Sequence, residues 1–559
     1  MILAMLWRSV PPAEMETKSR RGCYAVLAGL LTLAFLVSVE CYAIPATLGG
    51  DRNAYLLGGK MLAAGRFAGI TPPDPYVYLG PNWVMPEPGR FVLKYPLGLP
   101  LIYAIIRLIA GPGHWIAVAH QLSPIAASLA VLGTFYLLRP LVGSRYALLG
   151  MLLVATSPVN FYYANLPNSH APALCMAVWG MTLLFDWWRR GGTGRAIAAG
   201  FLLGCNFTIR YSEGLLILPL ILIWFFRTGG QRREIFRSLA LPMAWAFPVA
   251  GLLAFNFITI GHANGYGLTH ESTGFAVSYF CRNWQVMASE LYQNTILFLF
   301  PVIILGAVIS LVHETRISLV FWIWSGVTVM TYTSYYWIPG ADETDMRYVR
   351  FVLTVLPALA WAAVWLLRQC ADQFGRAGTI GSLAMVGISS VMNLRAALPH
   401  AEQLYHDDRT YRAQQKHVLA HIPAGSVIFA DEPTLAPMDA AGDWRLYSSE
   451  LFTPHYVRSH AAHDPDAPQM MQVERAQRLS ELLGGQSSGQ LVDQQNRLIE
   501  NARANGRHVY VVLSHDGCAA FCSHFKLQPS VVDRWDIDGR QMEIDEVEPI
   551  SANRRSMGR

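Results

Sequence analysis

Apolar runs separated by short polar turns fill the chain between residues 22 and 396. The first run, Cys23 to Ile44, follows the basic segment Lys18-Ser19-Arg20-Arg21 and is long enough to cross the roughly 30 Å hydrocarbon layer as a helix. Ten further runs follow, at residues 115–138, 146–164, 170–188, 196–209, 214–227, 238–260, 292–312, 317–338, 349–368 and 378–396. The pattern predicts an all-α polytopic membrane domain with about 11 transmembrane helices.

The run from Leu97 to Ala110 decides the topology. It is short for a span, carries Arg107 and is bracketed by Pro96 and Gly111-Pro112-Gly113, which favours an interfacial or re-entrant helix. If it does not cross, the cytoplasmic loops contain Arg139, Arg145, Arg189, Arg190, Arg195, Arg227, Arg232, Arg233, Arg237, Arg316, Arg368 and Arg376. The positive-inside rule is then obeyed at every return, whereas a crossing would place these arginines outside.

This topology divides the chain into a cytoplasmic N-terminus (residues 1–21), a membrane domain (22–396) and an extracytoplasmic domain (397–559). The first outer loop then spans residues 46–96. After residue 397 the composition becomes polar, and Val427–Ala430, Val509–Leu513 and a hairpin from Arg534 to Ile544 read as strands. Residues 474–483 and 489–504 read as helices. A small soluble α/β domain is therefore expected at the C-terminus.

Composition supports a membrane protein. The 559-residue chain is 53% hydrophobic and 14% charged, against about 25% charged residues in soluble domains. The net charge of +5 is small and falls mostly in short loops, which argues against a nucleic-acid partner. The eight cysteines show no zinc-ligand spacing; Cys518 and Cys522 suit either a disulfide or a pair of free thiols.

Two residues of the first outer loop are candidates for chemistry. Asp51 stands just past the first span, where partial desolvation strengthens a carboxylate as a base; the alternative is an N-cap for the helical run from Asn53 to Ala64. Lys94, before Tyr95-Pro96, can bind a phosphate as a point charge or extend to the interface as an anchor.

Four further candidates lie at predicted outer turns. Arg347 and Arg350 stand at the mouth of an apolar span and suit bidentate phosphate binding, although Asp342, Glu343 and Asp345 offer local partners. Arg210 lies in a short turn between two apolar runs, where an ionisable group indicates function. His170 opens a span and is either an interfacial anchor or a catalytic group.

Together these motifs resemble the GT-C membrane glycosyltransferases, in the branch of aminoarabinose transferase and the protein O-mannosyltransferases. The resemblance covers residues 22 to about 396. It rests on Gly50-Asp51-Arg52-Asn53-Ala54-Tyr55-Leu56, Lys94-Tyr95-Pro96-Leu97-Gly98-Leu99-Pro100, Ser157-Pro158 and Arg347-Tyr348-Val349-Arg350-Phe351. The motifs are short, but their order and membrane side agree with the family.

The resemblance implies an inverting glycosyltransferase that moves a sugar from a polyprenyl-phosphate donor to a glycan, lipid or protein acceptor. Asp51 becomes the general base that activates the acceptor, and Lys94 and Arg347 or Arg350 become ligands of the donor phosphate. Tyr55, Arg210 and His170 are assigned to substrate binding. The implied location is the bacterial inner (plasma) membrane, among membrane lipids, with the N-terminus cytoplasmic and residues 397–559 periplasmic.

One departure from the family concerns acidic residues. Members often carry a second acid in the first loop or in the later outer turn, which here reads Asn168-Ser169-His170. Asp74 and Glu87 remain as substitutes, and the resemblance leaves a divalent metal open. The rival function is a lipid or sugar transporter or flippase, but no internal repeat is found and the charged residues gather on one face.

Overall fold

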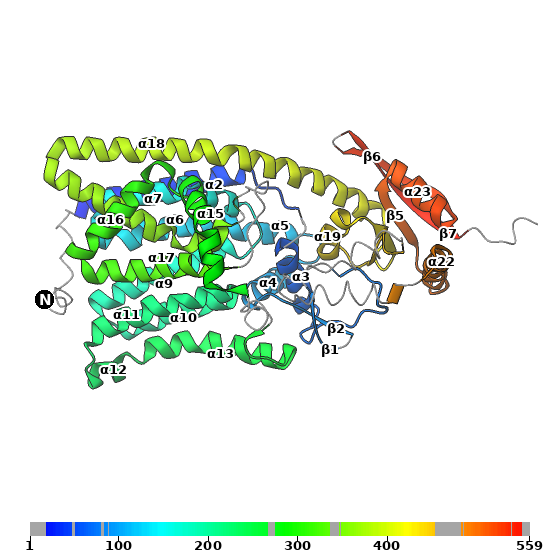
Figure 1. Cartoon of the computed structure of the whole chain (residues 1–559), viewed down its shortest axis with the longest axis horizontal. Helices are drawn as coiled ribbons and strands as arrows, with labels where there is room; N and C mark the ends of the chain where they lie inside the picture. Colours follow the sequence, from blue (N-terminus) through cyan, green and yellow to red (C-terminus); the bar gives the residue numbers. More distant parts are fainter. Residues whose placement is uncertain are drawn as a thin grey trace, which may run out of the picture.

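A computed structural model describes residues 18–46, 51–79, 83–87, 89–265, 274–335, 346, 348–452, 482–483, 486–537 and 539–549. Helices form an elongated bundle at one end, and a small sheet domain lies at the other (Figure 1). The short helices α3 (Asp51–Ala63) and α4 (Gly98–Ala110) lie between them. The expected combination of an apolar helical domain with a small C-terminal sheet domain is confirmed.

The bundle follows the predicted apolar runs closely. Its helices are α2 (Lys18–Glu40), α5 (Trp115–His120), α6 (Leu122–Val142), α7 (Ser144–Thr156), α8 (Pro158–Ala164), α9 (His170–Arg190), α10 (Thr193–Ile209), η1 (Tyr211–Leu216), α11 (Ile217–Thr228), α12 (Arg232–Ser238), α13 (Ala240–Ile260), α15 (Val277–Asn294), η3 (Leu297–Leu299), α16 (Phe300–His313), α17 (Thr315–Thr333), η4 (Val349–Val355) and α18 (Leu356–His421). Helix α15 was not foreseen, because its apolar residues fall short of a span.

The expected count of about 11 transmembrane helices is not confirmed. Within the described residues, five helices are long and apolar enough to cross a membrane: Gly22–Glu40, Trp115–Val142, Tyr211–Thr228, Ala240–Ile260 and Val349–His421. A sixth candidate is the pair α7 and α8, which is bent by 62° where Ser157-Pro158 interrupts the helix. Helix α4 has 13 residues, too few to cross, as its Pro and Gly brackets predicted.

Helix α18 connects the bundle to the C-terminal domain. It has non-helical backbone at Gly375 (φ 59°, ψ −129°), where the chain reverses direction at the far end of the bundle (Figure 1). The arm from residue 376 to residue 421 is roughly 70 Å long at 1.5 Å per residue, about twice the hydrocarbon thickness. The helix therefore continues through residue 397, where the composition changes, and ends only at His421.

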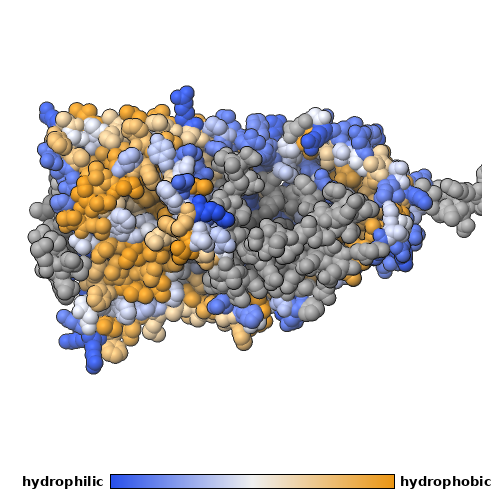
Figure 2. All heavy atoms as spheres, in the orientation of Figure 1, coloured by the Kyte–Doolittle hydropathy of each residue, from blue (hydrophilic) through white to orange (hydrophobic). Residues whose placement is uncertain are grey.

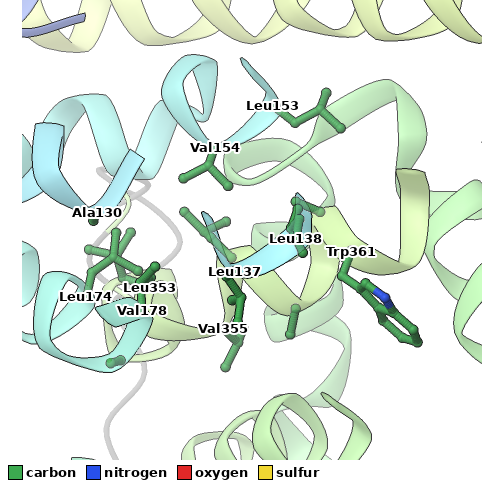
Figure 3. Close-up of a cluster of buried hydrophobic side chains, with 14 of the residues drawn as sticks. Ala130, Leu137, Leu138, Leu153, Val154, Leu174, Val178, Leu353, Val355 and Trp361 are labelled. Atoms are coloured by element: carbon green, nitrogen blue, oxygen red, sulfur yellow. The ribbon is translucent and has the colours of Figure 1, made fainter. Parts of the chain in front are cut away.

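The bundle core is a large cluster of buried hydrophobic side chains. Figure 3 shows part of it, with Leu137 and Leu138 of α6, Val154 of α7, Val178 of α9 and Trp361 of α18 among the clustered side chains. These side chains are buried, and the close packing of buried side chains leaves the helices little freedom to slide against one another. Outside this core, the surface over the bundle is largely hydrophobic, whereas the C-terminal end is hydrophilic (Figure 2). This division fits a bundle in contact with lipid.

The C-terminal domain is built on a five-stranded mixed sheet. The strand order is β4 (Arg445–Ser448), β3 (Val427–Ala430), β5 (Val509–Ser514), β7 (Arg540–Pro549) and β6 (Leu527–Ile537), and β3 pairs in parallel with both neighbours. Helices α19 (Glu432–Ala441), α22 (Ser488–Ala504) and α23 (His515–Phe525) complete the domain. The predicted strands, hairpin and helix 489–504 are confirmed; most of helix 474–483 lies outside the described residues.

The cysteine pair of this domain is not bonded. Cys518 and Cys522 lie one turn apart on α23, and both thiols are buried and free. Burial is the main cause that raises the pKa of each thiol to about 12, which keeps both protonated and unreactive at neutral pH. Of the two alternatives that the sequence left open, the structure has the free pair.

Helices α3 and α4 cross at a contact that only glycine permits. A Cβ at Gly59 would lie 2.5 Å from the Cβ of Tyr103 and 3.0 Å from its carbonyl carbon, and one at Gly58 would lie 2.9 Å from the Cβ of Pro100. Since real Cβ atoms do not approach so closely, any side chain there must push the helices apart. The hairpin of β1 (Trp83–Glu87) and β2 (Arg90–Leu93) leads from α3 to α4.

The crossing can be tested with a single methyl group. We expect Gly59→Ala to lower the unfolding free energy by about 1–3 kcal/mol, because the new Cβ overpacks the α3–α4 contact. Gly29→Ala in α2 is the control, since a Cβ there meets no atom within 4 Å. The measurement is the thermal unfolding midpoint of the purified protein in detergent. Equal midpoints for the two variants would contradict a close crossing.

Candidate functional site

The site is organised by one face of α3. This helix begins at Asp51, and Tyr55 stands one turn further on the same face. The buried Tyr55 hydroxyl donates a hydrogen bond of 2.9 Å to Ser169 Oγ, in the turn before α9. The Asp51 side chain lies outside the described part of the structure, so only its place at the start of α3 is established.

An aromatic pair connects Tyr55 to Lys94. The ring centroids of Tyr55 and Tyr95 are 4.6 Å apart, and the Lys94 ammonium lies 5.2 Å from the Tyr95 ring centroid. This contact orients the Lys94 side chain without neutralising it. No ion pair or hydrogen bond of the Lys94 ammonium is seen among the described residues. Lys94 therefore has its charge available for an anionic ligand at this place.

The second part of the site lies where two antiparallel helices have their ends together. Helix α9 begins at His170 and α10 ends at Ile209, so the hairpin brings His170 beside Arg210. One Arg210 Nη lies 2.5 Å from His170 Nδ1, and both side chains are buried. Because a guanidinium can only donate, Nδ1 accepts this bond and the imidazole is neutral in this arrangement. The predicted candidates His170 and Arg210 thus form one unit.

Arg350 joins the same unit from η4. Its backbone is within hydrogen-bond reach of the His170 imidazole, and its charge acts on that ring together with the charge of Arg210. The guanidinium of Arg350 also lies 4.9 Å from the Phe351 ring centroid. Arg347, the other predicted arginine of this motif, lies outside the described residues. The structure therefore brings together Tyr55, His170, Arg210 and Arg350, with Lys94 linked through Tyr95.

The sequence reading missed a buried acid in this cluster. Glu213 of η1 is 3% exposed, interacts with the charge of Arg210, and accepts a hydrogen bond of 3.5 Å from Thr354 Oγ1. Burial disfavours the charged form of this carboxyl, and the nearby Arg210 guanidinium and the Thr354 hydroxyl oppose that effect. The signal was present as Arg210-Tyr211-Ser212-Glu213, where an acid follows a base by three residues between two apolar runs.

The two proposed substitutes for a second acid are engaged elsewhere. Asp74 accepts backbone hydrogen bonds from Tyr76 and Val77 and a 2.7 Å hydrogen bond from the Tyr447 hydroxyl. Glu87 pairs with Arg90 three residues later, at 3.1 Å, on an exposed part of the β1–β2 hairpin. Asp74 therefore fastens the 46–96 segment to the C-terminal domain, and Glu87 stabilises a local turn.

Helix α3 is fixed at both ends by charged contacts. Near its start, Arg52 lies 3.3 Å from the buried carboxylate of Asp408 on α18. In its last turn, Lys60 binds Asp443 Oδ1 at 3.0 Å and the carbonyls of Asp439 and Gly442 at 3.1 and 2.5 Å. These carbonyls lie at the C-terminal end of α19, where the helix dipole stabilises a positive charge. The C-terminal domain thus helps to set the position of α3.

A cavity of about 630 Å³ lies along the second half of α3, between this helix, the 71–79 segment and the C-terminal domain. Its lining includes five basic and two acidic residues: Lys60, Arg66, Arg107, Arg445, Arg507, Asp439 and Asp443. Trp83 and Trp444 supply aromatic surface. The cavity is large enough for one or more sugar rings, and its charge favours an anionic occupant.

The Lys60 contacts predict that two variants lower the stability of the protein by unequal amounts. Lys60→Met removes three contacts and we expect it to cost about 2 kcal/mol or more, whereas Asp443→Asn removes one exposed ion pair and should cost less than about 1 kcal/mol. The measurement is thermal unfolding of the purified protein at pH 7. An equal or larger loss with Asp443→Asn would contradict the carbonyl contacts.

The Asp443 ion pair also has a predictable pH dependence. Desolvation raises the pKa of Asp443, but the Lys60 ammonium outweighs it, and the net pKa lies below its ordinary value. The contribution of the pair is therefore complete at neutral pH and is lost as the pH falls through this lowered value, below about 4. Asp443→Asn should remove that part of the acid sensitivity, measured as the difference in unfolding midpoint between pH 7 and pH 3.

Comparison with solved structures identifies the fold. ArnT from Cupriavidus metallidurans in the apo state superposes with a TM-score of 0.60 at 12% identity, over 94% of this chain and 98% of that chain. The same protein bound to undecaprenyl phosphate gives a TM-score of 0.56 at 13% identity, over 95% and 98%. At this level of identity the likeness shows the fold, from the bundle through the C-terminal domain.

Comparison of the sequence gives a partial match. Residues 94–259, from Lys94 to the end of α13, match the model of a family described as dolichyl-phosphate-mannose-protein mannosyltransferase. A comparison with curated proteins found no match. The family match begins at Lys94 and includes His170 and Arg210. The resemblance that the motifs suggested is confirmed: this is a membrane protein with the fold of the GT-C glycosyltransferases.

Proposed function

We propose that the protein is an inverting glycosyltransferase that transfers a sugar from a polyprenyl-phosphate donor to an acceptor at the outer face of the membrane. The observation that carries this proposal is the chain of contacts from Lys94 through Tyr95 and Tyr55 to Ser169, next to which His170 meets Arg210 and Arg350. A solved relative in fold, ArnT, has been seen with undecaprenyl phosphate, which supports a lipid phosphate as ligand.

The cations divide into binding and positioning groups. Lys94 contacts only an aromatic ring among the described residues, and Arg350 reaches the site from the start of η4, so both are assigned to the donor phosphate together with Arg347. Arg210 lies near the buried Glu213, and its guanidinium donates to His170. Arg210 therefore holds the imidazole in place through Nδ1. The other ring nitrogen of His170 is free to donate its N–H to the Arg350 backbone.

The reaction follows from this placement. The acceptor nucleophile attacks the anomeric carbon from the side opposite the phosphate, the bond to the phosphate oxygen breaks, and the acceptor proton passes to the Asp51 carboxylate. Charge develops on the leaving lipid phosphate, where Lys94 and the arginines stabilise it. A positioned general base typically contributes a rate factor of about 10²–10⁴. Inversion at the anomeric carbon is the stereochemical consequence of a single displacement.

The proposal also covers where the protein resides and what kind of acceptor it uses. The N-terminus is cytoplasmic, residues 397–559 are extracytoplasmic, and the protein resides in a bacterial inner membrane. The basic cavity beside α3 suits an acceptor that carries negative charge near the accepting hydroxyl or amine. The direct test supplies undecaprenyl-phosphate-linked sugars of several kinds, together with anionic glycan, lipid or protein acceptors, to the protein in nanodiscs and measures release of undecaprenyl phosphate. Binding of the lipid without release for any sugar and acceptor would contradict a transferase.

The phosphate ligands can be tested one at a time. We expect Lys94→Ala, Arg347→Ala and Arg350→Ala each to weaken undecaprenyl phosphate binding by at least tenfold, because each removes a charged contact worth about 1.5–3 kcal/mol. Lys416→Ala is the control, since this lysine is exposed on α18. Affinity is measured by the lipid-dependent shift in unfolding midpoint. Unchanged affinity in all three variants would remove the phosphate assignment.

The base is tested by Asp51→Asn. Asparagine keeps the side-chain shape and caps a helix about as well as aspartate, but it cannot accept the proton. The variant should fold, bind undecaprenyl phosphate and lose at least 99% of sugar transfer, in line with a base contribution of about 10²–10⁴. Asp407→Asn, an exposed carboxylate of α18, is the matched control. Near-parental transfer by Asp51→Asn would return Asp51 to a helix cap.

A further inference from the structure

Three metal-ligating side chains meet where α18 ends against the sheet. His417 and His421 are one turn apart on the last part of α18, so their rings lie on one helix face. Asp533 comes from β6, the edge strand of the five-stranded sheet, directly after a register shift between Val531 and Asp533. A bulge of this kind re-aims a side chain, here toward α18. Asp533 is more than 100 positions after the two histidines in the chain, and only the fold brings it to them.

The three groups already converge on one point. His417 Nδ1 lies 2.6 Å and His421 Nδ1 3.2 Å from the same oxygen, Asp533 Oδ2, and one ligand atom from each residue falls within 4.8 Å of the others. The two imidazole rings are nearly parallel, at 14°. Tetrahedral bonds of 2.0–2.1 Å place ligand atoms about 3.3 Å apart. The observed separations of 2.6 and 3.2 Å lie close to that spacing.

Neighbouring groups hold the ligands in place. The His417 ring stacks on Trp535 at 4.7 Å with an angle of 6° between the planes, and Trp535 is itself buried against the sheet. His421 Nδ1 also lies 3.0 Å from the His417 carbonyl, so this ring can bind through Nδ1 or, keeping the carbonyl bond, through Nε2. Metal-binding histidines commonly have such a carbonyl partner. The cluster is therefore preorganised.

We propose that His417, His421 and Asp533 bind a divalent transition-metal ion, with zinc as the best fit. Two imidazoles and one carboxylate are a donor set that zinc accepts, with a fourth position left for water. The side chains are 34%, 39% and 18% exposed, so an ion can enter from solvent and keep a water ligand. The proposal does not depend on the glycosyltransferase function.

The metal would fasten the outer end of α18 to the edge of the sheet. Asp408, nine residues earlier on α18, binds Arg52 at the start of α3, and Lys60 at the end of α3 binds the C-terminal domain. A fixed junction at His417 closes this set of contacts between helix α18, helix α3 and the sheet domain. The ion is therefore a structural link, which predicts an effect on stability that does not require substrate.

The test uses the full-length protein in detergent after removal of metal with a chelator. Zinc sulfate is titrated by calorimetry, and the unfolding midpoint is measured with and without zinc and with excess EDTA. We expect one ion per chain with a dissociation constant of 10 µM or lower, roughly 7 kcal/mol of binding free energy, and a midpoint that zinc raises and EDTA lowers. Cobalt substitution should give the visible absorption of a tetrahedral site.

Two conservative variants and one control decide the outcome. Asp533→Asn and His421→Gln keep shape and hydrogen bonding, and each should weaken zinc binding by at least tenfold. His508→Ala should bind as the parent does, because His508 pairs with Glu546 on another part of the same sheet. Absence of saturable zinc binding in the parent, or parental affinity in both conservative variants, would overturn the metal site.

Discussion

The position of α3 is the constraint on which the rest of the site depends. Gly58 and Gly59 let this helix approach Pro100 and Tyr103 of α4 more closely than any other residue would allow. Because the contact is between backbone and first side-chain carbons, the two helices cannot slide without separating. Asp51 and Tyr55 are carried on this rigid pair, so the proposed base is positioned by packing and not by a flexible loop.

Burial of charge explains why Arg210 and Lys94 have different surroundings. In the low-dielectric surroundings of the bundle end, Arg210 lies near Glu213 and donates to His170, so its guanidinium has a hydrogen-bond partner within the protein. Lys94 has an aromatic neighbour that attracts its charge without neutralising it. A lipid phosphate entering this region would meet Lys94, whose ammonium has no acidic partner among the described residues. A cation in this state favours the binding of an anion.

Hydrophobic patterning predicted the bundle helices, the strands and the soluble domain because these features depend on local periodicity. Its count of about 11 spans is not confirmed: among the described residues five helices are long and apolar enough to cross a membrane, and the predicted run 146–164 is the bent pair of α7 and α8. The contacts of Asp74 with Tyr447, and of Glu213 with Thr354, join residues that are far apart in the chain. Long-range pairing of this kind leaves little trace in one sequence, although the spacing of Arg210 and Glu213 offered one.

Helix α18 shows how the membrane and soluble parts act as one body. Its long arm leaves the bundle, binds Arg52 through Asp408 and ends at His417 and His421 beside β6. Lys60 and Asp74 make the return connections from the 51–79 segment to the C-terminal domain. Because these contacts form a closed circuit of helix, segment and sheet, a displacement of the C-terminal domain must also displace α3. The domain therefore shapes the basic cavity that it borders, and an occupant of that cavity can influence Asp51, the proposed base at the start of α3.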